Sequence, residues 1–90
     1  MVRYSIRFSP GANRDLQQLA PYERERLVDA LGDVAGHEQP SSHPDVQALT
    51  GDHQGRLRLR VGDWRAILEL DKPDLLVHAV GDRETIYDND

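Results

Sequence analysis

The chain has 90 residues, with 16 Asp and Glu against 11 Lys and Arg, and a formal net charge of -5. This length has room for one domain, expected over residues 1–90, and the absence of cysteine excludes disulfide bridges and thiolate metal sites. No run approaches the roughly 18 to 20 apolar residues that span a bilayer, and the opening MVRYSIRF lacks a signal-peptide pattern, so we expect a cytoplasmic protein.

Residues 2–8 predict a strand with one buried face, because apolar side chains alternate with polar ones: Val2, Tyr4, Ile6 and Phe8. Ser9-Pro10 then supplies a helix N-cap and a first-turn proline. The apolar residues that follow repeat at helical spacing and predict a helix of about three turns: Ala12, Leu16 and Leu19. This helix is expected to end at Ala20-Pro21.

A second amphipathic helix is predicted from Tyr22 to a C-cap at Gly36, because one of its faces is apolar: Leu27, Leu31 and Val34. The two helices would form an αα-hairpin. Residues 37–45 contain two prolines and no apolar period, so they predict a loop. Val46 to Leu49 are expected to form a short turn.

Three extended runs complete the pattern: Arg56 to Val61, Trp64 to Leu70 and Leu75 to Val80. They are separated by Gly62-Asp63 and by Asp71 to Asp74, which are both good turn sequences. The element order is therefore βααβββ. Segregated elements of this kind favour an α+β fold, with an antiparallel sheet and the αα-hairpin packed on one of its faces.

The run RLRLRV at residues 56–61 places arginines on one side of its predicted strand. Because neighbouring side chains point to opposite faces, Arg56, Arg58 and Arg60 share a face. Guanidinium groups at this spacing could follow a nucleic-acid backbone and donate paired N–H bonds to phosphate oxygens. The alternative is a solvated face paired with nearby carboxylates.

These arginines belong to a longer pattern, GRLRLRVGDWRAILEL followed by LLVHAVGDRETIY. Together with the opening YSIRFSP and Leu49-Thr50-Gly51, it resembles the RelE/ParE superfamily of toxins from toxin–antitoxin pairs, over nearly the whole chain. The resemblance implies the same βααβββ order and a ribosome-dependent mRNA endoribonuclease that needs no metal or other cofactor. It also implies a cognate antitoxin as partner, with the ribosome and mRNA as targets.

The resemblance implies a set of catalytic residues: Arg56, Arg58, Arg65, Arg83 and Tyr87. The shared strand face, and the place of Trp64 beside Arg65, predict RNA contacts by an overlapping set: Arg56, Arg58, Arg60 and Trp64. The implied chemistry is attack of the ribose 2′-OH on the adjacent phosphate. Arginine can stabilise the charge that builds on phosphorus, but it stays protonated in proteins and is therefore a poor base. Tyr87 is the leading candidate for the base; its alternatives are stacking on a nucleobase and packing near the chain end without a catalytic role.

For several other residues the sequence favours a structural role over a catalytic one. His78 lies in an apolar run and is expected to be a structural histidine, and Glu69 is expected to pair with Arg65, with a role as base less favoured. Trp64 could equally cover the edge of the core. The remaining histidines have no recognised metal-ligand spacing, so no metal site is expected: His37, His43 and His53.

The acidic net charge, and arginines where the nucleases often have lysines, leave two alternatives open. One is a ParE-like toxin that inhibits gyrase, because that branch shares the fold and much of the arginine pattern. The other is a catalytically weak protein of the same fold that only binds an antitoxin.

Overall fold

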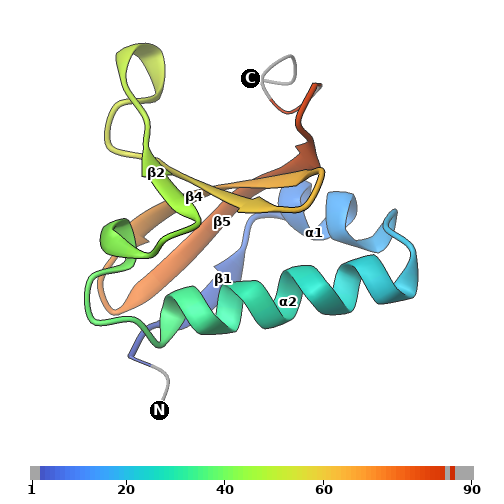
Figure 1. Cartoon of the computed structure of the whole chain (residues 1–90), viewed down its shortest axis with the longest axis horizontal. Helices are drawn as coiled ribbons and strands as arrows, with labels where there is room; N and C mark the ends of the chain where they lie inside the picture. Colours follow the sequence, from blue (N-terminus) through green and yellow to red (C-terminus); the bar gives the residue numbers. More distant parts are fainter. Residues whose placement is uncertain (1–2, 85, 87–90) are drawn as a thin grey trace.

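The computed structural model describes residues 3–84 and 86 of the chain. Its elements follow in this order: β1 (Ser5–Phe8), α1 (Pro10–Gln17), α2 (Pro21–Ala35), η1 (Pro40–Ser42), β2 (Val46–Ala48), η2 (Gly51–His53), β3 (Leu57–Val61), β4 (Trp64–Asp71) and β5 (Asp74–Asp82). The strands form a five-stranded sheet in the order β1-β5-β4-β3-β2, and both helices lie on one side of it (Figure 1). The predicted α+β fold with a helical hairpin on one face is confirmed.

Two details of the sheet differ from the prediction. β1 pairs in parallel with β5, with Ser5 opposite Asp74, whereas the β2–β3, β3–β4 and β4–β5 pairs are antiparallel. The segment Val46–Ala48, expected as a turn, forms the short strand β2 against β3. Three residues are too few to show a period of two, so the pairing partner rather than the local pattern makes this segment a strand.

The helices begin where the sequence predicts and α1 ends early. The Ser9 hydroxyl accepts a hydrogen bond from the Ala12 amide at 3.0 Å and donates one to the His78 carbonyl at 2.9 Å, so the cap also joins α1 to β5. α1 spans 8 residues and not three full turns, because the chain must reverse before Pro21 opens α2. Leu19 is buried beyond the end of α1, and α2 ends at the predicted C-cap, Gly36.

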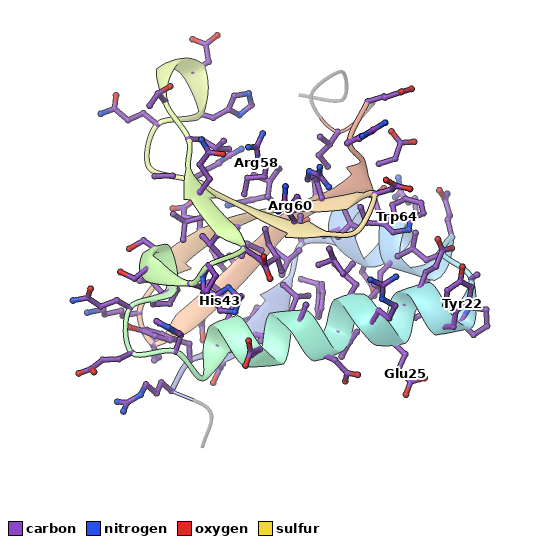
Figure 2. All side chains as sticks on the ribbon, viewed as in Figure 1. Tyr22, Glu25, His43, Arg58, Arg60 and Trp64 are labelled. Atoms are coloured by element: carbon purple, nitrogen blue, oxygen red, sulfur yellow. The ribbon has the colours of Figure 1, made fainter. Side chains whose placement is uncertain are left out.

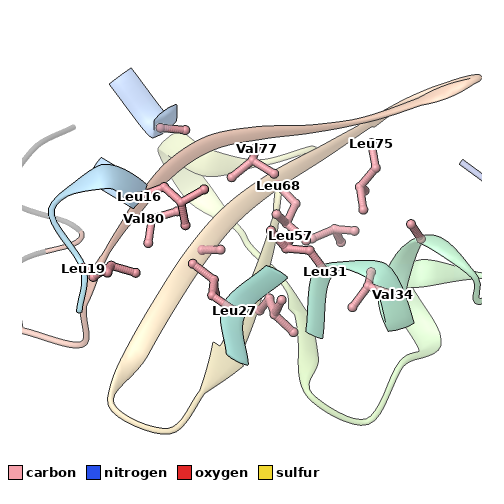
Figure 3. Close-up of a cluster of buried hydrophobic side chains, with 14 residues drawn as sticks. Leu16, Leu19, Leu27, Leu31, Val34, Leu57, Leu68, Leu75, Val77 and Val80 are labelled. Atoms are coloured by element: carbon pink, nitrogen blue, oxygen red, sulfur yellow. The ribbon is translucent and has the colours of Figure 1, made fainter. Parts of the chain in front are cut away.

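The core lies between the helices and the sheet, and Figure 3 shows α2 leucines pointing toward strand residues. Leu27 and Leu31 of α2 and Leu68 of β4 are each 0% exposed. Burial of each such side chain contributes about 1.5–3 kcal/mol to folding. The helices thereby occupy one face of the sheet, whereas the other face carries polar side chains beside Ile67 and Ile86, which are each 3% exposed. Within the described part of the chain, no helix is long and apolar enough to cross a membrane.

Candidate nucleic-acid interface

The face of the sheet away from the helices carries the strand arginines. Leu57 and Leu59 of β3 are buried toward the helices, so Arg58 and Arg60 point to the open side, where Figure 2 shows them away from α2. Arg60 lies opposite Arg65 of β4, and residues in register share a face. We call Arg58, Arg60 and Arg65 the arginine face.

Arg60 and Arg65 form a cross-strand pair of like charges, which destabilises a sheet. The Arg60 side chain is exposed and makes no hydrogen bond or ion pair with residues 3–84 or 86. Arg65 is half-buried, and its Nη1 donates to the carbonyls of Gly62 at 2.8 Å and Trp64 at 2.9 Å. Neither guanidinium makes an ion pair with a carboxylate among residues 3–84 and 86, and such an uncompensated pair of cations is typical of a surface that binds an external anion.

A hollow of about 580 Å³ opens at the hairpin end of the arginine face. It is lined by four arginines, from three elements and from the segment after β5, and by two aspartates: Arg26, Arg60, Arg65, Arg83, Asp45 and Asp63. The Arg83 amide donates to the Asp63 carbonyl at 3.0 Å, which holds the end of β5 against the β3–β4 turn. Residues far apart in sequence thus surround one cationic hollow.

Arg26 is a member of the hollow that sequence reasoning missed. It lies on α2, and its Nη2 is 3.5 Å from the position that a Cβ on Gly62 would occupy. The guanidinium therefore packs against the turn between β3 and β4. The helical pattern gave a weak signal, because Arg26 precedes the half-buried Ala30 by four residues and shares its side of the helix.

The structure separates Arg56 from this hollow. Arg56 precedes β3, and its amide donates to the His53 carbonyl of η2 at 3.0 Å, so it lies at the far end of the strand. Arg58 lies between the two ends, where its Nη2 donates to Oε1 of Gln47 on β2. A second hollow of about 200 Å³ beside β2 includes Arg58 and Arg60 in its lining.

Trp64 lies on the helix side of the sheet, apart from the arginine face. Its indole Nε1 donates to Oε2 of Glu23 on α2 at 2.7 Å, and its ring packs against the core. This placement favours the alternative in which Trp64 covers the core edge. Tyr87, expected as base or stacking residue, lies outside the described residues.

The expected ion pair between Glu69 and Arg65 is replaced by a different pair. Oε1 of Glu69 lies 2.8 Å from Nε2 of His78. The register shifts between Ile67, opposite Ala79, and Leu68, opposite Val77, so His78 is an extra residue in β5. Sequence alternation cannot reveal such a bulge.

His43 is a buried histidine in the loop between α2 and β2, at 8% exposure. Its Nδ1 accepts from the Asp45 amide at 3.1 Å, so Nε2 donates to Oδ2 of Asp33 at 2.7 Å. Both ring nitrogens are bonded, and His43 fastens this loop to α2. Among residues 3–84 and 86, no three His, Cys, Asp or Glu side chains are grouped as a metal site would require.

Comparison with protein families gives one matching model, described as "ParE toxin of type II toxin-antitoxin system, parDE", over residues 6–87. No curated protein sequence matches the chain.

Several solved structures are similar to the fold. A chain of the RelBE2 toxin–antitoxin complex from Mycobacterium tuberculosis is 28% identical, with a TM-score of 0.77 over 92% of this chain and 94% of that one. A chain of the RelE–RelB complex from Pyrococcus horikoshii is 22% identical, with a TM-score of 0.72 over 91% and 97%. A chain of the YoeB–YefM complex from Staphylococcus aureus is 17% identical, with a TM-score of 0.64 over 87% and 94%.

Proposed function

Because this chain belongs to the ParE toxin family of the RelE/ParE superfamily and is the toxin of a type II toxin–antitoxin system, we propose that it cleaves mRNA on the translating ribosome without a metal. Its proposed partners are a cognate antitoxin, the ribosome and mRNA. The similar structures of toxin–antitoxin complexes support the antitoxin.

The observation that carries the proposal is the hollow lined by Arg26, Arg60, Arg65 and Arg83. Guanidinium groups donate paired N–H bonds to phosphate oxygens and keep their charge at any working pH. A phosphodiester held there would have its developing negative charge stabilised as the ribose 2′-OH attacks phosphorus. The products would be a cyclic phosphate and a free 5′-OH.

We assign the proposed roles by position. Arg60 and Arg65 would hold the scissile phosphate, and Arg83 would close the hollow from the end of β5. Arg56 and Arg58, further along β3, would bind the backbone of flanking nucleotides. Tyr87 stays a proposed catalytic residue on the resemblance alone.

A second candidate, inhibition of DNA gyrase, is favoured by one specific observation. The matching family model is that of ParE toxins. A cationic surface suited to RNA phosphate would also suit DNA phosphate, because the two backbones carry the same phosphodiester anions. The geometry of the arginine face does not separate the two polymers.

Inducible expression without an antitoxin separates these functions. We expect growth arrest with translation-dependent cuts in a reporter mRNA, mapped by primer extension, and intact chromosomal DNA. Arg60→Ala should relieve the arrest, whereas Arg14→Ala, an exposed arginine on α1, should not. Arrest with DNA breaks and intact mRNA would move the assignment to gyrase, and no arrest would leave a protein that only binds an antitoxin.

A further inference from the structure

The hollow of about 580 Å³ continues from the arginine face around the end of β3 to α2. Its lining includes Arg60 on the arginine face and Val61, which packs against the core on the helix side. β2 pairs with β3 only before Arg60, and the Arg60 amide then donates to the Asp45 carbonyl at 2.9 Å. Past this contact no described strand pairs with the outer edge of β3, so the hollow reaches Arg26 of α2. In Figure 1 the β3–β4 turn lies between α2 and the segment that follows β5.

The guanidinium of Arg26 is held against the β3–β4 turn. Its Nη2, Nη1 and Cζ atoms are 3.5, 3.7 and 4.0 Å from the position that a Cβ on Gly62 would occupy. Arg26 is nevertheless exposed, and its side chain makes no hydrogen bond or ion pair with residues 3–84 or 86. A cation that packing already holds in place loses little freedom when it binds an anion.

The acids nearest to Arg26 along α2 do not neutralise it. Glu23 precedes Arg26 by three residues, a spacing that allows an ion pair on a helix, but its Oε2 accepts from Nε1 of Trp64 at 2.7 Å. Asp29 follows by three residues and is exposed. Neither acid forms an ion pair with Arg26 in the described structure, so the positive charge of Arg26 is available to a ligand.

The charge and size of the hollow exceed what one phosphate needs. Four arginines and two aspartates line it, which leaves an excess of two positive charges. Each phosphodiester of a nucleic acid carries one negative charge, so one phosphate would leave half of this excess uncompensated. A volume of about 580 Å³ lies within the range of roughly 300–1,000 Å³ that pockets for drug-sized ligands have, so a second phosphate has room.

We propose that the hollow binds two consecutive phosphates of the mRNA, the scissile one at Arg60 and Arg65 and a neighbouring one at Arg26. This inference rests on the proposed ribonuclease function. The mRNA backbone passes around the end of β3, from the arginine face to α2, and Arg26 donates paired N–H bonds to the neighbouring phosphate. A contact of this kind, away from the reacting bond, fixes the position of the scissile phosphate.

The test measures binding and cleavage on ribosomes programmed with synthetic mRNA. Primer extension on unmodified mRNA first locates the cut. For binding, a 2′-deoxynucleotide at the cut site removes the attacking hydroxyl. We expect Arg26→Ala to weaken binding by about tenfold, as the loss of one charge-assisted contact should. The slope of log K against log salt should become shallower by about 0.7, the change that one lost phosphate contact produces on a single strand.

A neutral methylphosphonate linkage identifies the phosphate that Arg26 contacts. Placed immediately 5′ or 3′ of the cut site, at one of these two positions it should weaken wild-type binding and slow wild-type cutting as much as Arg26→Ala does. On that mRNA, Arg26→Ala should cause no further loss. Arg14→Ala removes an exposed arginine of α1 outside the hollow and should match the wild type on every mRNA.

The outcomes separate this inference from the function on which it rests. Arg26→Ala that binds and cuts like the wild type would overturn the two-phosphate site and leave the nuclease function in place. A loss of the same size with either neutral linkage would also overturn it, since Arg26 would then act elsewhere than on the mRNA backbone. A wild type that makes no cut would instead defeat the proposed function itself. Thermal unfolding checks each variant, and Arg26→Gln, which keeps more of the packing on Gly62, repeats the test if Arg26→Ala is unstable.

Discussion

Arg60 and Arg65 illustrate a conflict between stability and function at single residues. They face each other across β3 and β4, where like charges repel. Arg65 compensates through bonds to two carbonyls of the hairpin, whereas Arg60 has no side-chain partner among the described residues. The two arginines should therefore respond differently to truncation.

Arg60→Ala should leave the free energy of unfolding unchanged or slightly raised, because it removes one of two facing cations. Arg65→Ala should lower it, since the Gly62 and Trp64 carbonyls lose their donor. Urea denaturation of the two variants beside the wild type measures the difference. Equal destabilisation by both substitutions would show that the repulsion argument is wrong.

His43→Ala should lower the free energy of unfolding by about 1–3 kcal/mol, because the Asp45 amide and the Asp33 carboxylate lose their partner. Glu38→Ala, at an exposed position of the same loop, should stay within about 0.5 kcal/mol of the wild type. Thermal unfolding compares them. A His43→Ala protein as stable as Glu38→Ala would mean that the loop is held by other contacts.

At the level of elements, the β3–β4 turn brings the site together. Gly62 has a φ of +60°, a conformation that side-chain-bearing residues adopt at a cost of roughly 1–2 kcal/mol. The turn places Arg60 beside Arg65, and Arg26 packs its guanidinium against Gly62. Changes to this turn should therefore disturb the hollow as well as the sheet.

Gly62→Ala should destabilise the protein by about 1–2 kcal/mol through its positive φ. Gly32→Ala is a control whose expected effect on stability has the opposite sign, since Gly32 lies within α2 and a Cβ there would meet nothing within 4 Å. It should stabilise the protein by about 0.5–1 kcal/mol. Urea denaturation gives both values, and a shift of the same sign in both would contradict the backbone argument.

Helices and strands whose apolar residues repeat regularly could be predicted from the sequence, whereas the pairing of one strand with another could not. The alternation in β3 and the apolar face of α2 gave both elements nearly at their observed bounds. Nothing local in Ser5–Phe8 encodes a parallel partner, since β5 lies about seventy residues away in sequence and the pairing depends on the helical hairpin between them.

The candidate site was predictable to a similar extent. Arg60 and Arg65 could be placed on one face because each lies on a strand with regular alternation. The contribution of Arg26 depends on how α2 packs under the β3–β4 turn, and the Glu69–His78 pair depends on a bulge. Tertiary packing decides both, so neither has a local sequence signal.

For the whole molecule, the distribution of charge matters more than its sum. The net charge is -5, yet four arginines and only two aspartates line one hollow, and other acids such as Glu25 and Asp29 are exposed on α2. The electrostatic field of the whole, net-negative molecule should repel RNA at low ionic strength, while the arginines around the hollow attract it. At high salt the Debye length shrinks to a few ångströms and local contacts dominate.

The double variant Glu25→Gln, Asp29→Asn should therefore bind programmed ribosomes faster than the wild type at low salt. This gain should vanish near 1 M salt, where screening removes the long-range field. Stopped-flow association at several salt concentrations measures it. A gain that persists at high salt would indicate that these acids act by direct contact instead.

The most direct test of the central claim compares the wild type, Arg60→Ala and Arg14→Ala in the cleavage of mRNA on purified, programmed ribosomes. If the arginine face binds the reacting phosphate, the wild type and Arg14→Ala should both make cuts that end in a cyclic phosphate. Arg60→Ala should cut at least about tenfold more slowly, because each lost charge contact to the reacting phosphate costs about 1.4 kcal/mol or more. Equal cutting by all three proteins, or none by the wild type, would contradict this claim.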